Sequence, residues 1–568
     1  MESNKPANGP GVADVIVDFL EQAGIEACFG VPGGQTIPLY AAARRRGYRH
    51  ILMHDERNAA IAADAYARTT GKAGVCDATV GPGATNLVSG LAEAHASSIP
   101  VLALIADIKT TREHLRRKGV ASQALEQHSL FESVTKWIGR VQKPESIADV
   151  LEQALRVACS GRAGPVVVEI PEDVFASPAP GGMTATGSAV WPRYRTAPLD
   201  EDVREAAALL TSAARPVILA GGGALASGAG EAVIALAEKL GAAIVTSING
   251  KGVIDERHPL ARGAVGVFGD VRASITLKAA DVVLVLGSKF AQFNSFLWRL
   301  PARAQTIVQV DIDGEELGRA IPARLAMVAD ARETARRIVG EIGETRSRAV
   351  WKLDAQIPMQ PGTDADDTAI APEAVLEAIN ARTDQNTLLV SDASLSSGWT
   401  ASRYNIKGAG RKFLCPRGLA GIGWAGGAAI GAAVGASEGA RVVAVAGDGA
   451  AAYWLGEMET AARLNLPIIY IVLNNSGFGW VVQGERMLGI HPQSSFGHVD
   501  FAAVARGFGI DAVTAETPQQ LEDGIAAAFA VKGPYLIDVR SSDRASPSVD
   551  YALLDPASAS AYGAYGMG

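Results

Sequence analysis

Two short polar motifs each follow an apolar run, as active-site residues do at the ends of buried strands. Gly447-Asp448-Gly449 follows the run 441–446, and Asn474-Asn475 follows the run 467–473. Asn475 comes 27 residues after Asp448 (475 − 448 = 27), which is long enough for one right-handed strand–helix–strand crossover with its helix at Tyr453 to Leu464. The spacing therefore predicts that both motifs lie at the carboxyl edge of one parallel sheet.

The side chains of these motifs suit a hard cation. The Asp448 carboxylate, the Asn475 amide oxygen and the Gly477 carbonyl are the oxygen ligands that Mg²⁺ takes while it keeps phosphate oxygens in its shell. Gly447 and Gly449 would let phosphates approach the backbone closely. We therefore predict a magnesium and diphosphate site here, with a pair of ordinary turns as the alternative.

The elements that must position this site alternate between strands and helices along almost the whole chain. Such alternation predicts an α/β fold of three consecutive doubly wound parallel-sheet domains. We expect these domains at 1–180, 196–345 and 370–542, followed by a C-terminal tail at 543–568. The proline- and glycine-rich segment 177–198 and the polar stretch 356–367 are the expected linkers. The clearest strands are 27–29, 50–53, 74–76, 101–105, 165–170, 216–220, 243–246, 282–286, 307–311, 386–391, 441–446, 468–473 and 535–539.

Composition excludes several classes of protein. The 568 residues carry a formal net charge of −8, which gives no general attraction to nucleic acid or to an anionic membrane. Four widely spaced cysteines without a CxxC pair favour reduced thiols. No apolar signal segment opens the chain, and no stretch of about 20 apolar residues follows. We therefore expect a cytoplasmic protein without a membrane or nucleic-acid partner.

The chain resembles the thiamine diphosphate enzymes, whose signature is GDG, about 25 to 30 residues, then NN. Its three expected domains are similar to the pyrimidine-binding, central and diphosphate-binding domains of the acetolactate synthase-like branch. Two further segments match that branch, Phe29-Gly-Val-Pro-Gly-Gly34 and Gly81-Pro-Gly-Ala-Thr-Asn86. The resemblance implies thiamine diphosphate and Mg²⁺ as cofactors. It also implies a homodimer or homotetramer, because in the family the pyrimidine contacts and the metal site come from different subunits.

Cofactor activation in this family needs a carboxyl group beside the aminopyrimidine ring, where its proton favours the imino tautomer. Glu56 follows the expected strand 50–53 and precedes a helix of small residues, which matches the family's pattern for that acid. The alternative is an acid that only stabilises the helix N-terminus, by about 0.3–1 kcal/mol.

Other site residues are implied by their place in the family's motifs. Gly33 and Gly34 would frame the mouth of the site, and Gly83 would contact the pyrimidine. Gln123 falls where the family has an active-site glutamine, and Ile422 where it has the apolar wedge between the two cofactor rings; a plain core isoleucine is the alternative. The remaining expected cofactor contacts are Ala393, Ser394, Leu395, Gly447, Asp448, Gly449, Ala450, Asn475, Gly477 and Phe478.

The sequence also departs from the acetolactate synthases. Trp480 stands where they have methionine, Gly484 where they have the tryptophan that narrows the acceptor pocket, and Ser122 where they have phenylalanine. These changes favour a larger or differently shaped substrate. In the central domain, Gly221-Gly-Gly223 is typical of a nucleotide-binding turn, but the segment 263–269 lacks the synthases' methionine and histidine. We therefore expect that this turn either binds ADP or a CoA-derived nucleotide or serves only to pack the domain. FAD is a less favoured ligand.

Two segments raise the question of a CoA substrate, and a third holds a further candidate catalytic residue. The tail is expected either to be disordered or to close as a lid, and the basic loop 403–412 either to reach a CoA phosphate or to lie in solvent. Gln493, with His491 as the other candidate, lies on a segment that could arch over the cofactor. The preferred hypothesis is a 2-hydroxyacyl-CoA lyase that releases formyl-CoA and a ketone or aldehyde. The alternatives are an acetolactate synthase-type carboligase or 2-oxoacid decarboxylase, and a cofactor-binding regulatory protein without catalysis.

Overall fold

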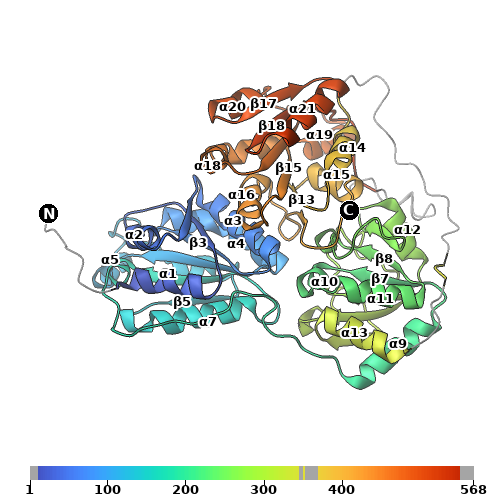
Figure 1. Ribbon diagram of the computed structural model, residues 1–568, viewed down its shortest axis with the longest axis horizontal. Helices are drawn as coiled ribbons and strands as arrows, with labels where there is room; N and C mark the ends of the chain where they lie inside the picture. The colour runs from blue at the N-terminus through green and yellow to red at the C-terminus, as the bar shows by residue number, and fades with distance from the viewer. Residues whose placement is uncertain (1–9, 344–348, 352–368, 550–568) are drawn as a thin grey trace. The chain divides into compact units, whose positions relative to one another are not determined.

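The computed structural model describes residues 10–343, 349–351 and 369–549 (Figure 1). The expected linker at 356–367 lies within the undescribed part, as does most of the tail. The chain divides into two compact units, and each is described by itself. The first consists of Met1–Tyr194, Pro416–Glu438 and Trp454–Leu466, and the second of Arg195–Cys415, Gly439–Tyr453 and Pro467–Gly568. Among the described residues, no helix is long and apolar enough to cross a membrane.

The first unit contains a six-stranded parallel sheet in the order β2-β1-β3-β4-β6-β5. Its central strands are buried along their whole length, which is why they appear in the sequence as continuous apolar runs. The strands are β1 (Ala27–Gly30), β2 (Arg49–Leu52), β3 (Gly74–Ala78), β4 (Val101–Asp107), β5 (Trp137–Arg140) and β6 (Val166–Pro171). The helices are α1 (Val12–Gln22), α2 (Ile37–Arg46), α3 (Glu56–Thr70), α4 (Pro82–Ser97), α5 (Glu113–Arg117), α6 (Gln127–Phe131), α7 (Ile147–Cys159), α8 (Glu172–Phe175), α16 (Ala425–Gly435) and α18 (Glu457–Arg463).

The second unit contains two more six-stranded parallel sheets. The central one has the order β12-β11-β10-β7-β8-β9, with β7 (Pro216–Ala220), β8 (Ala243–Thr246), β9 (Ala261–Ala264), β10 (Val282–Leu286), β11 (Thr306–Asp311) and β12 (Leu325–Val328). The other has the order β14-β13-β15-β16-β18-β17, with β13 (Thr387–Ser391), β14 (Phe413–Leu414), β15 (Arg441–Gly447), β16 (Ile468–Asn474), β17 (Asp511–Ala515) and β18 (Tyr535–Arg540). Helices flank each sheet (Figure 1). They are α9 (Asp200–Ser212), α10 (Gly222–Ser227), α11 (Gly230–Leu240), α12 (Val271–Ala279), α13 (Ala331–Ile342), α14 (Pro372–Arg382), α15 (Leu395–Arg403), α17 (Asp448–Ala451), α19 (Gly479–Met487), α20 (Phe501–Gly507) and α21 (Pro518–Ala530).

This architecture confirms the predicted α/β fold with three parallel sheets. The strands that the sequence did not indicate are β5, β9, β12, β14 and β17, and all five lie at sheet edges. These strands are short, and all of them except the buried two-residue β14 are partly exposed, so their apolar pattern is weak.

The helix expected at Tyr453 to Leu464 is confirmed as the shorter α18, and only its expected first turn is wrong. A 3₁₀ turn at Ala452–Trp454 separates α17 from α18. The Trp454 indole is buried, and a methyl group on Gly426 would lie 2.2–2.5 Å from it, so the turn places this ring against α16. Gly456 then caps the N-terminus of α18.

Helices α3 and α16 pack closely, with backbone against backbone at Gly427 and Gly431 and side chains of α3 against Gly435. Three glycines of α16, spaced by four residues, face α3: Gly427 meets Asn58, Gly431 meets Ala62, and Gly435 meets Tyr66. Because residue numbers rise together along both helices, the two run in the same direction and their N-terminal ends lie together. Glu56 is the first residue of α3, and Ile422 precedes α16 by three residues.

Replacing Gly431 by alanine is expected to destabilise the first unit by about 3 kcal/mol, the upper end of overpacking costs. A methyl group there would overlap the Ala62 carbonyl, and backbone atoms cannot move away as the end of a flexible side chain could. The matched control is Gly340→Ala in α13, where nothing lies within 4 Å. That change should stabilise the protein by about 0.5–1 kcal/mol through helix propensity. Thermal unfolding midpoints of the two variants measure both effects. Equal shifts in the two variants would contradict the close packing of α16 on α3.

Candidate cofactor site

The predicted metal ligands come together at the carboxyl ends of β15 and β16. These strands pair in parallel, with Gly447 opposite Leu473. The Asp448 carboxylate accepts hydrogen bonds from the backbone N–H groups of Gly449 (2.8 Å), Asn475 (3.1 Å) and Gly477 (3.3 Å). The segment after β16 therefore wraps around this carboxylate, with the backbones of Asn475 and Gly477 directly beside it.

Asp448 is 2% exposed, and this burial raises the pKa of its carboxyl to about 6 against the lowering effect of the surrounding N–H groups. Burial of a carboxylate is costly unless a cation or several donors compensate it. One carboxylate with amide and carbonyl oxygens beside it is a donor set that fits Mg²⁺.

The two asparagines of the NN motif have different roles. The Asn474 side chain is buried and donates to the Asp538 carboxylate (2.8 Å) and to the Val499 carbonyl (2.9 Å). Asp538 in turn accepts the N–H of Phe501 at 3.1 Å. Asn474 therefore ties β16 to β18 and to the start of α20, and Asn475 is the half-buried residue left for a ligand.

The predicted diphosphate contacts border the same edge. Ala393 and Ser394 follow β13, which pairs with β15, and Leu395 begins α15. A methyl group on Gly447 would meet only the Ser396 hydroxyl, at 3.9 Å, so the space beside Gly447 is open toward the N-terminus of α15. A helix N-terminus next to open space suits a phosphate group, and these residues fit a diphosphate.

Gly449 and its neighbours serve packing as well. A methyl group on Gly449 would lie 2.7 Å from the Phe478 ring, so this glycine makes room for the ring. Phe478 packs edge to face on Phe496 (5.4 Å between centroids), and Ala450 is buried in α17. The sequence hypothesis that Gly449 serves close phosphate approach has no separate support in this geometry.

Glu56 lies in the first unit at the start of α3, with Asp55 capping the helix. Its carboxylate is 9% exposed and accepts a hydrogen bond from the Asn86 side chain at 3.0 Å. A methyl group on Gly83 would approach the other Glu56 oxygen to 3.1 Å. The 81–86 segment therefore holds the acid; sequence reasoning noted this motif without seeing that Asn86 binds Glu56.

Gly33 and Gly34 differ in their surroundings. A methyl group on Gly33 would overlap Thr79, so this glycine permits close packing of the 29–34 loop on the end of β3. Around Gly34 there is open space, with nothing within 4 Å of an added methyl group. Gly34 is thus the residue of the pair that faces a free volume.

Gln123 is exposed and has a φ of 60°, and its backbone lies against Gly81. The glutamine whose side chain binds the 81–86 segment is Gln127, which is 1% exposed. Its Oε1 accepts the N–H of Gly81 (3.0 Å), and its Nε2 donates to the Ala106 carbonyl (3.2 Å). Ser122 is exposed beside Gln123.

Ile422 is partly exposed in the loop before α16, and Gln493 is exposed in the segment after α19. The Gln493 side chain donates only to the nearby carbonyl of His491, at 3.3 Å, and His491 is exposed as well. These contacts do not test the roles predicted for Gln493 and His491 from their place in the chain, which stay predictions.

Two departures from the synthase pattern meet in the second unit. Trp480 packs edge to face on Phe268, with ring centroids 5.0 Å apart, and Phe268 stacks on Phe293. Phe268 belongs to the altered segment 263–269, and Trp480 lies in the first turn of α19. The indole thus fills space between these elements, and Gly484, one turn further along α19, has no side chain.

The glycine turn of the central sheet is used for packing. Methyl groups on Gly221 or Gly223 would overlap or press on the backbone of Gly287. The Gly221 N–H donates to the Leu286 carbonyl (2.8 Å), and the Gly223 N–H donates to the Gly287 carbonyl (3.0 Å). A cavity of about 440 Å³ lies instead beside the segment that follows β10, lined by Lys289, Phe290, Ala291, Trp298, Arg319 and Ala320.

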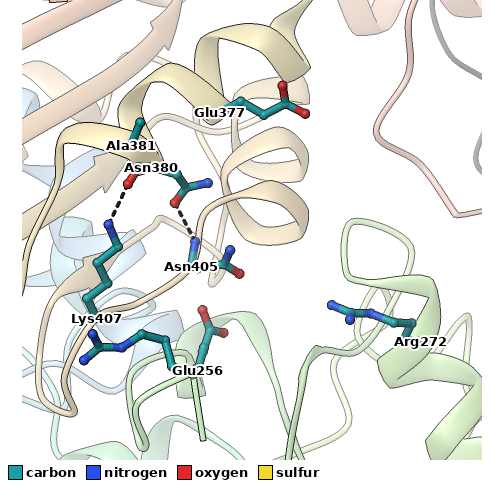
Figure 2. A pocket seen from close by; sticks show the side chains of 8 residues that line it. Glu256, Arg272, Glu377, Asn380, Ala381, Asn405 and Lys407 are labelled. Atoms are coloured by element: carbon teal, nitrogen blue, oxygen red, sulfur yellow. Dashed lines mark hydrogen bonds between the residues drawn. The ribbon is translucent and has the colours of Figure 1, made fainter.

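Cations of the basic loop 403–412 are bound within the fold. The Lys407 ammonium donates to the carbonyls of Asn380 and Thr383 (2.6 Å each) at the end of α14, beside an open pocket of about 670 Å³ (Figure 2). Arg411 donates to the Ala226 carbonyl, and burial lowers its pKa to about 10. These contacts give no support to a role in binding a CoA phosphate.

Another group of metal-capable side chains is buried between β1, β2 and β3. Cys28 and His50 both lie against the Asp77 carboxylate, at 3.6 Å and 2.5 Å. The His50–Asp77 distance is that of a hydrogen bond, whereas two ligands of one zinc ion stand about 3 Å apart or more. The cluster is thus a buried hydrogen-bonded pair with a thiol beside it, and all four cysteines are buried free thiols.

The buried side chain of Glu457 in the first unit should make the stability of the protein depend on pH. Glu457 begins α18, is fully buried, and accepts hydrogen bonds from the His54 N–H (3.1 Å) and the Thr460 hydroxyl (3.0 Å). Burial raises its pKa from 4.5 to about 7. Because the folded protein holds this proton more tightly than the unfolded chain, stability should fall as pH rises from about 4.5 to about 7.

Glu457→Gln should remove that part of the pH dependence, worth about 1–3 kcal/mol between the two ends of the range. Denaturant unfolding of both proteins at a series of pH values measures the difference. Parallel curves for the wild type and the variant would show that folding leaves the pKa of Glu457 unchanged.

The comparisons with known proteins agree with this geometry. Family models match residues 11–130 (thiamine pyrophosphate enzyme, N-terminal TPP binding domain), 203–338 (central domain) and 392–539 (C-terminal TPP binding domain). A probable acetolactate synthase large subunit of Methanocaldococcus jannaschii is 33% identical over 555 residues, 93% of this chain and 91% of the relative. Acetolactate synthase isozyme 1 large subunit of Escherichia coli is 31% identical over 93% of each chain.

Two decarboxylases are also similar. A probable 2-ketoarginine decarboxylase of Pseudomonas aeruginosa is 32% identical over 92% of this chain and 93% of the relative. The solved Rhodococcus jostii thiamine diphosphate-dependent 4-hydroxybenzoylformate decarboxylase has the same fold, with a TM-score of 0.81, 23% identity, and coverage of 94% of this chain and 99% of that one. With its predicted metal ligands gathered at one sheet edge and full-length relatives above 30% identity, this chain belongs to the thiamine pyrophosphate enzyme family, in its acetolactate synthase-like branch.

Proposed function

We propose that the protein is a thiamine diphosphate- and Mg²⁺-dependent enzyme that cleaves the carbon–carbon bond of a 2-oxo acid, either as a carboligase of the acetolactate synthase type or as a decarboxylase. The observation that carries this proposal is the carboxylate of Asp448 held among the N–H groups of the segment after β16, on a chain similar throughout to such enzymes. Bound thiamine diphosphate supplies the carbon nucleophile and accepts the electron pair of the cleaved bond.

The chain's own residues bind the cofactor, hold a proton and shape the substrate space. Asp448, Asn475 and Gly477 are the proposed ligands of Mg²⁺, and the open space between Gly447 and α15 the place of the diphosphate. Glu56, kept in place by Asn86, is proposed to hold a proton against the pyrimidine ring. This acid and this metal site argue against a regulatory protein without catalysis.

A CoA substrate has less support. The relatives described above are named as acetolactate synthases and 2-oxo acid decarboxylases. Lys407 and Arg411, two cations of the loop 403–412 that was considered for a CoA phosphate, bind carbonyls of the fold itself. We therefore propose the carboligase or decarboxylase ahead of the 2-hydroxyacyl-CoA lyase that the sequence favoured.

Gly484 favours a substrate larger than pyruvate. The glycine replaces a large ring on α19, and the nearby indole of Trp480 is turned to Phe268. Loss of a ring frees space that a longer substrate side chain can fill. The related enzymes named for 2-ketoarginine and 4-hydroxybenzoylformate act on such larger 2-oxo acids.

The test is a panel of pyruvate, linear and aromatic 2-oxo acids, and a 2-hydroxyacyl-CoA, each incubated with the protein, Mg²⁺ and thiamine diphosphate. Carbon dioxide release and product masses are measured. We expect release from at least one 2-oxo acid, with bulkier acids preferred. Thioester cleavage without carbon dioxide from any acid would overturn the proposal.

The proposed assembly is a homodimer or homotetramer. This follows the family, in which partner subunits complete each site, and activity should be lost together with cofactor binding when the protein is diluted into monomers. A fully active monomer in sedimentation would contradict it. In the central domain, the cavity beside Phe290 and Trp298 is the proposed place for ADP or a CoA-derived nucleotide, ahead of FAD.

A further inference from the structure

A buried carboxylate of the first unit binds three consecutive backbone N–H groups of the loop before α16. Glu93, in α4, has a side chain that is 4% exposed. Its Oε1 accepts the N–H of Gly418 (3.0 Å), and its Oε2 accepts those of Leu419 (2.7 Å) and Ala420 (2.9 Å). Charge-assisted bonds of this kind to successive amides fix a backbone more firmly than neutral bonds do.

Glu93 is itself held on its other side. The Ser97 hydroxyl donates to it at 2.6 Å, and the Arg68 guanidinium lies 3.4 Å away. Arg68 also makes two bonds to the fully buried Asp64 carboxylate, at 2.6 and 3.0 Å. One arginine thus faces two carboxylates, and the amide dipoles of the loop compensate the second negative charge.

The loop needs such an anchor because its conformation is unfavourable without one. Ala420 has a φ of 61°, a left-handed conformation that costs free energy for a residue with a Cβ atom. A methyl group on Gly418 would lie 2.7–2.8 Å from Ser97 and Ala96, so the loop touches the last turn of α4 directly. Leu419 is 59% exposed, so its side chain contributes little packing.

We propose that Glu93 is a positioning residue for catalysis, which holds the loop 418–420 so that Ile422 stands at the place required of the wedge between the cofactor rings. The inference rests on the proposed function, since it takes Ile422 as that wedge. Ile422 lies between the amides bound by Glu93 and the first turn of α16. Without the Glu93 hydrogen bonds, only the helix on its C-terminal side would hold the position of Ile422.

The first experiment needs no cofactor. Hydrogen–deuterium exchange with mass spectrometry is measured on peptides spanning 416–424 in the cofactor-free wild type, in Glu93→Gln and in the surface control Glu21→Gln. The glutamine is isosteric but loses the charge and one acceptor, so exchange of the loop amides should rise by about tenfold or more. Glu21 pairs with Arg46 at the surface, and its variant should match the wild type. Unchanged loop exchange in Glu93→Gln would overturn the proposal.

The second experiment uses the enzyme with Mg²⁺ and thiamine diphosphate, and follows by NMR the exchange of the reactive ring proton of the bound cofactor. Glu93→Gln should slow this exchange by about 10–100-fold, while cofactor affinity and KM stay near the wild-type values. Ile422→Ala should slow it too. In the double variant the two effects should fail to add, because both act through one side chain.

Additive effects in the double variant, or a normal exchange rate in Glu93→Gln, would overturn the positioning role. Failure of the proposed function gives a different result, because the wild type itself would then bind no cofactor or leave its ring proton unexchanged. Glu93→Asp keeps the charge on a shorter arm and should recover part of both readouts. No recovery, with a fold intact by circular dichroism, would count against the anchor.

Discussion

Replacing Glu56 by glutamine is expected to lower turnover by about 10²–10⁴-fold, the usual contribution of a positioned acid or base. Glutamine keeps the shape of the side chain and can still accept the Asn86 hydrogen bond, but it has no proton to share with a ring nitrogen. Cofactor affinity should change little, since the phosphates and the metal ion are bound elsewhere. Calorimetry of thiamine diphosphate binding and steady-state kinetics measure the two effects separately.

The control is Glu26→Gln, a change of the same kind in the same unit. Glu26 is 68% exposed and pairs with Lys72 at the surface, so its loss should cost less than about 1 kcal/mol of stability and no activity. Equal turnover of Glu56→Gln and the wild type would refute the assignment of the acid. A loss of cofactor binding in Glu56→Gln would show instead that the carboxylate is part of the binding site.

Asp448→Asn is expected to weaken Mg²⁺-dependent cofactor binding by at least about 100-fold. Changes to groups that merely support a metal ligand typically cost about 10–100-fold, and Asp448 is proposed as a direct ligand and the only charged one. The variant also loses an acceptor for the N–H groups of Asn475 and Gly477, so the segment after β16 should loosen. Isothermal titration with cofactor at several Mg²⁺ concentrations measures the effect.

Asp500→Asn is the matched control for this change. Asp500 lies in the same sheet domain and caps α20 by accepting the N–H of Ala503 at 2.8 Å. Asparagine is about as good as aspartate at a helix N-cap, so neither stability nor cofactor affinity should change much. Retention of Mg²⁺-dependent binding in Asp448→Asn would place the metal site elsewhere.

The sequence predicts the fold well where strands are buried on both faces. β4, β15 and β16 are continuous apolar runs, and their order along the chain fixes a parallel sheet through right-handed crossovers. The edge strands, such as β5 and β17, were not predictable, because half of each faces solvent and its pattern resembles a loop. The break between α17 and α18 depends on a distant partner of Trp454, which local propensity does not contain.

The site was predictable to the level of motifs but not of atoms. The GDG and NN spacing placed Asp448 and Asn475 together, yet only the structure assigns Asn474 to Asp538 and so separates the two asparagines. Glu93 gave no sequence signal, because its partners are backbone groups more than 300 residues away. Long-range contacts to main-chain atoms leave no trace in side-chain spacing.

The glycine contacts between α3 and α16 have a consequence for how this enzyme can diverge. Where glycines spaced by four residues let the facing helix approach this closely, the helices cannot slide by a small amount; the next register lies about 6 Å away, four residues along. Mutation and selection therefore cannot gradually shift Glu56, at the N-terminus of α3, relative to the loop that precedes α16. New substrate specificities must therefore arise in other elements such as α19, where Gly484 and Trp480 already differ from the residues of the synthases.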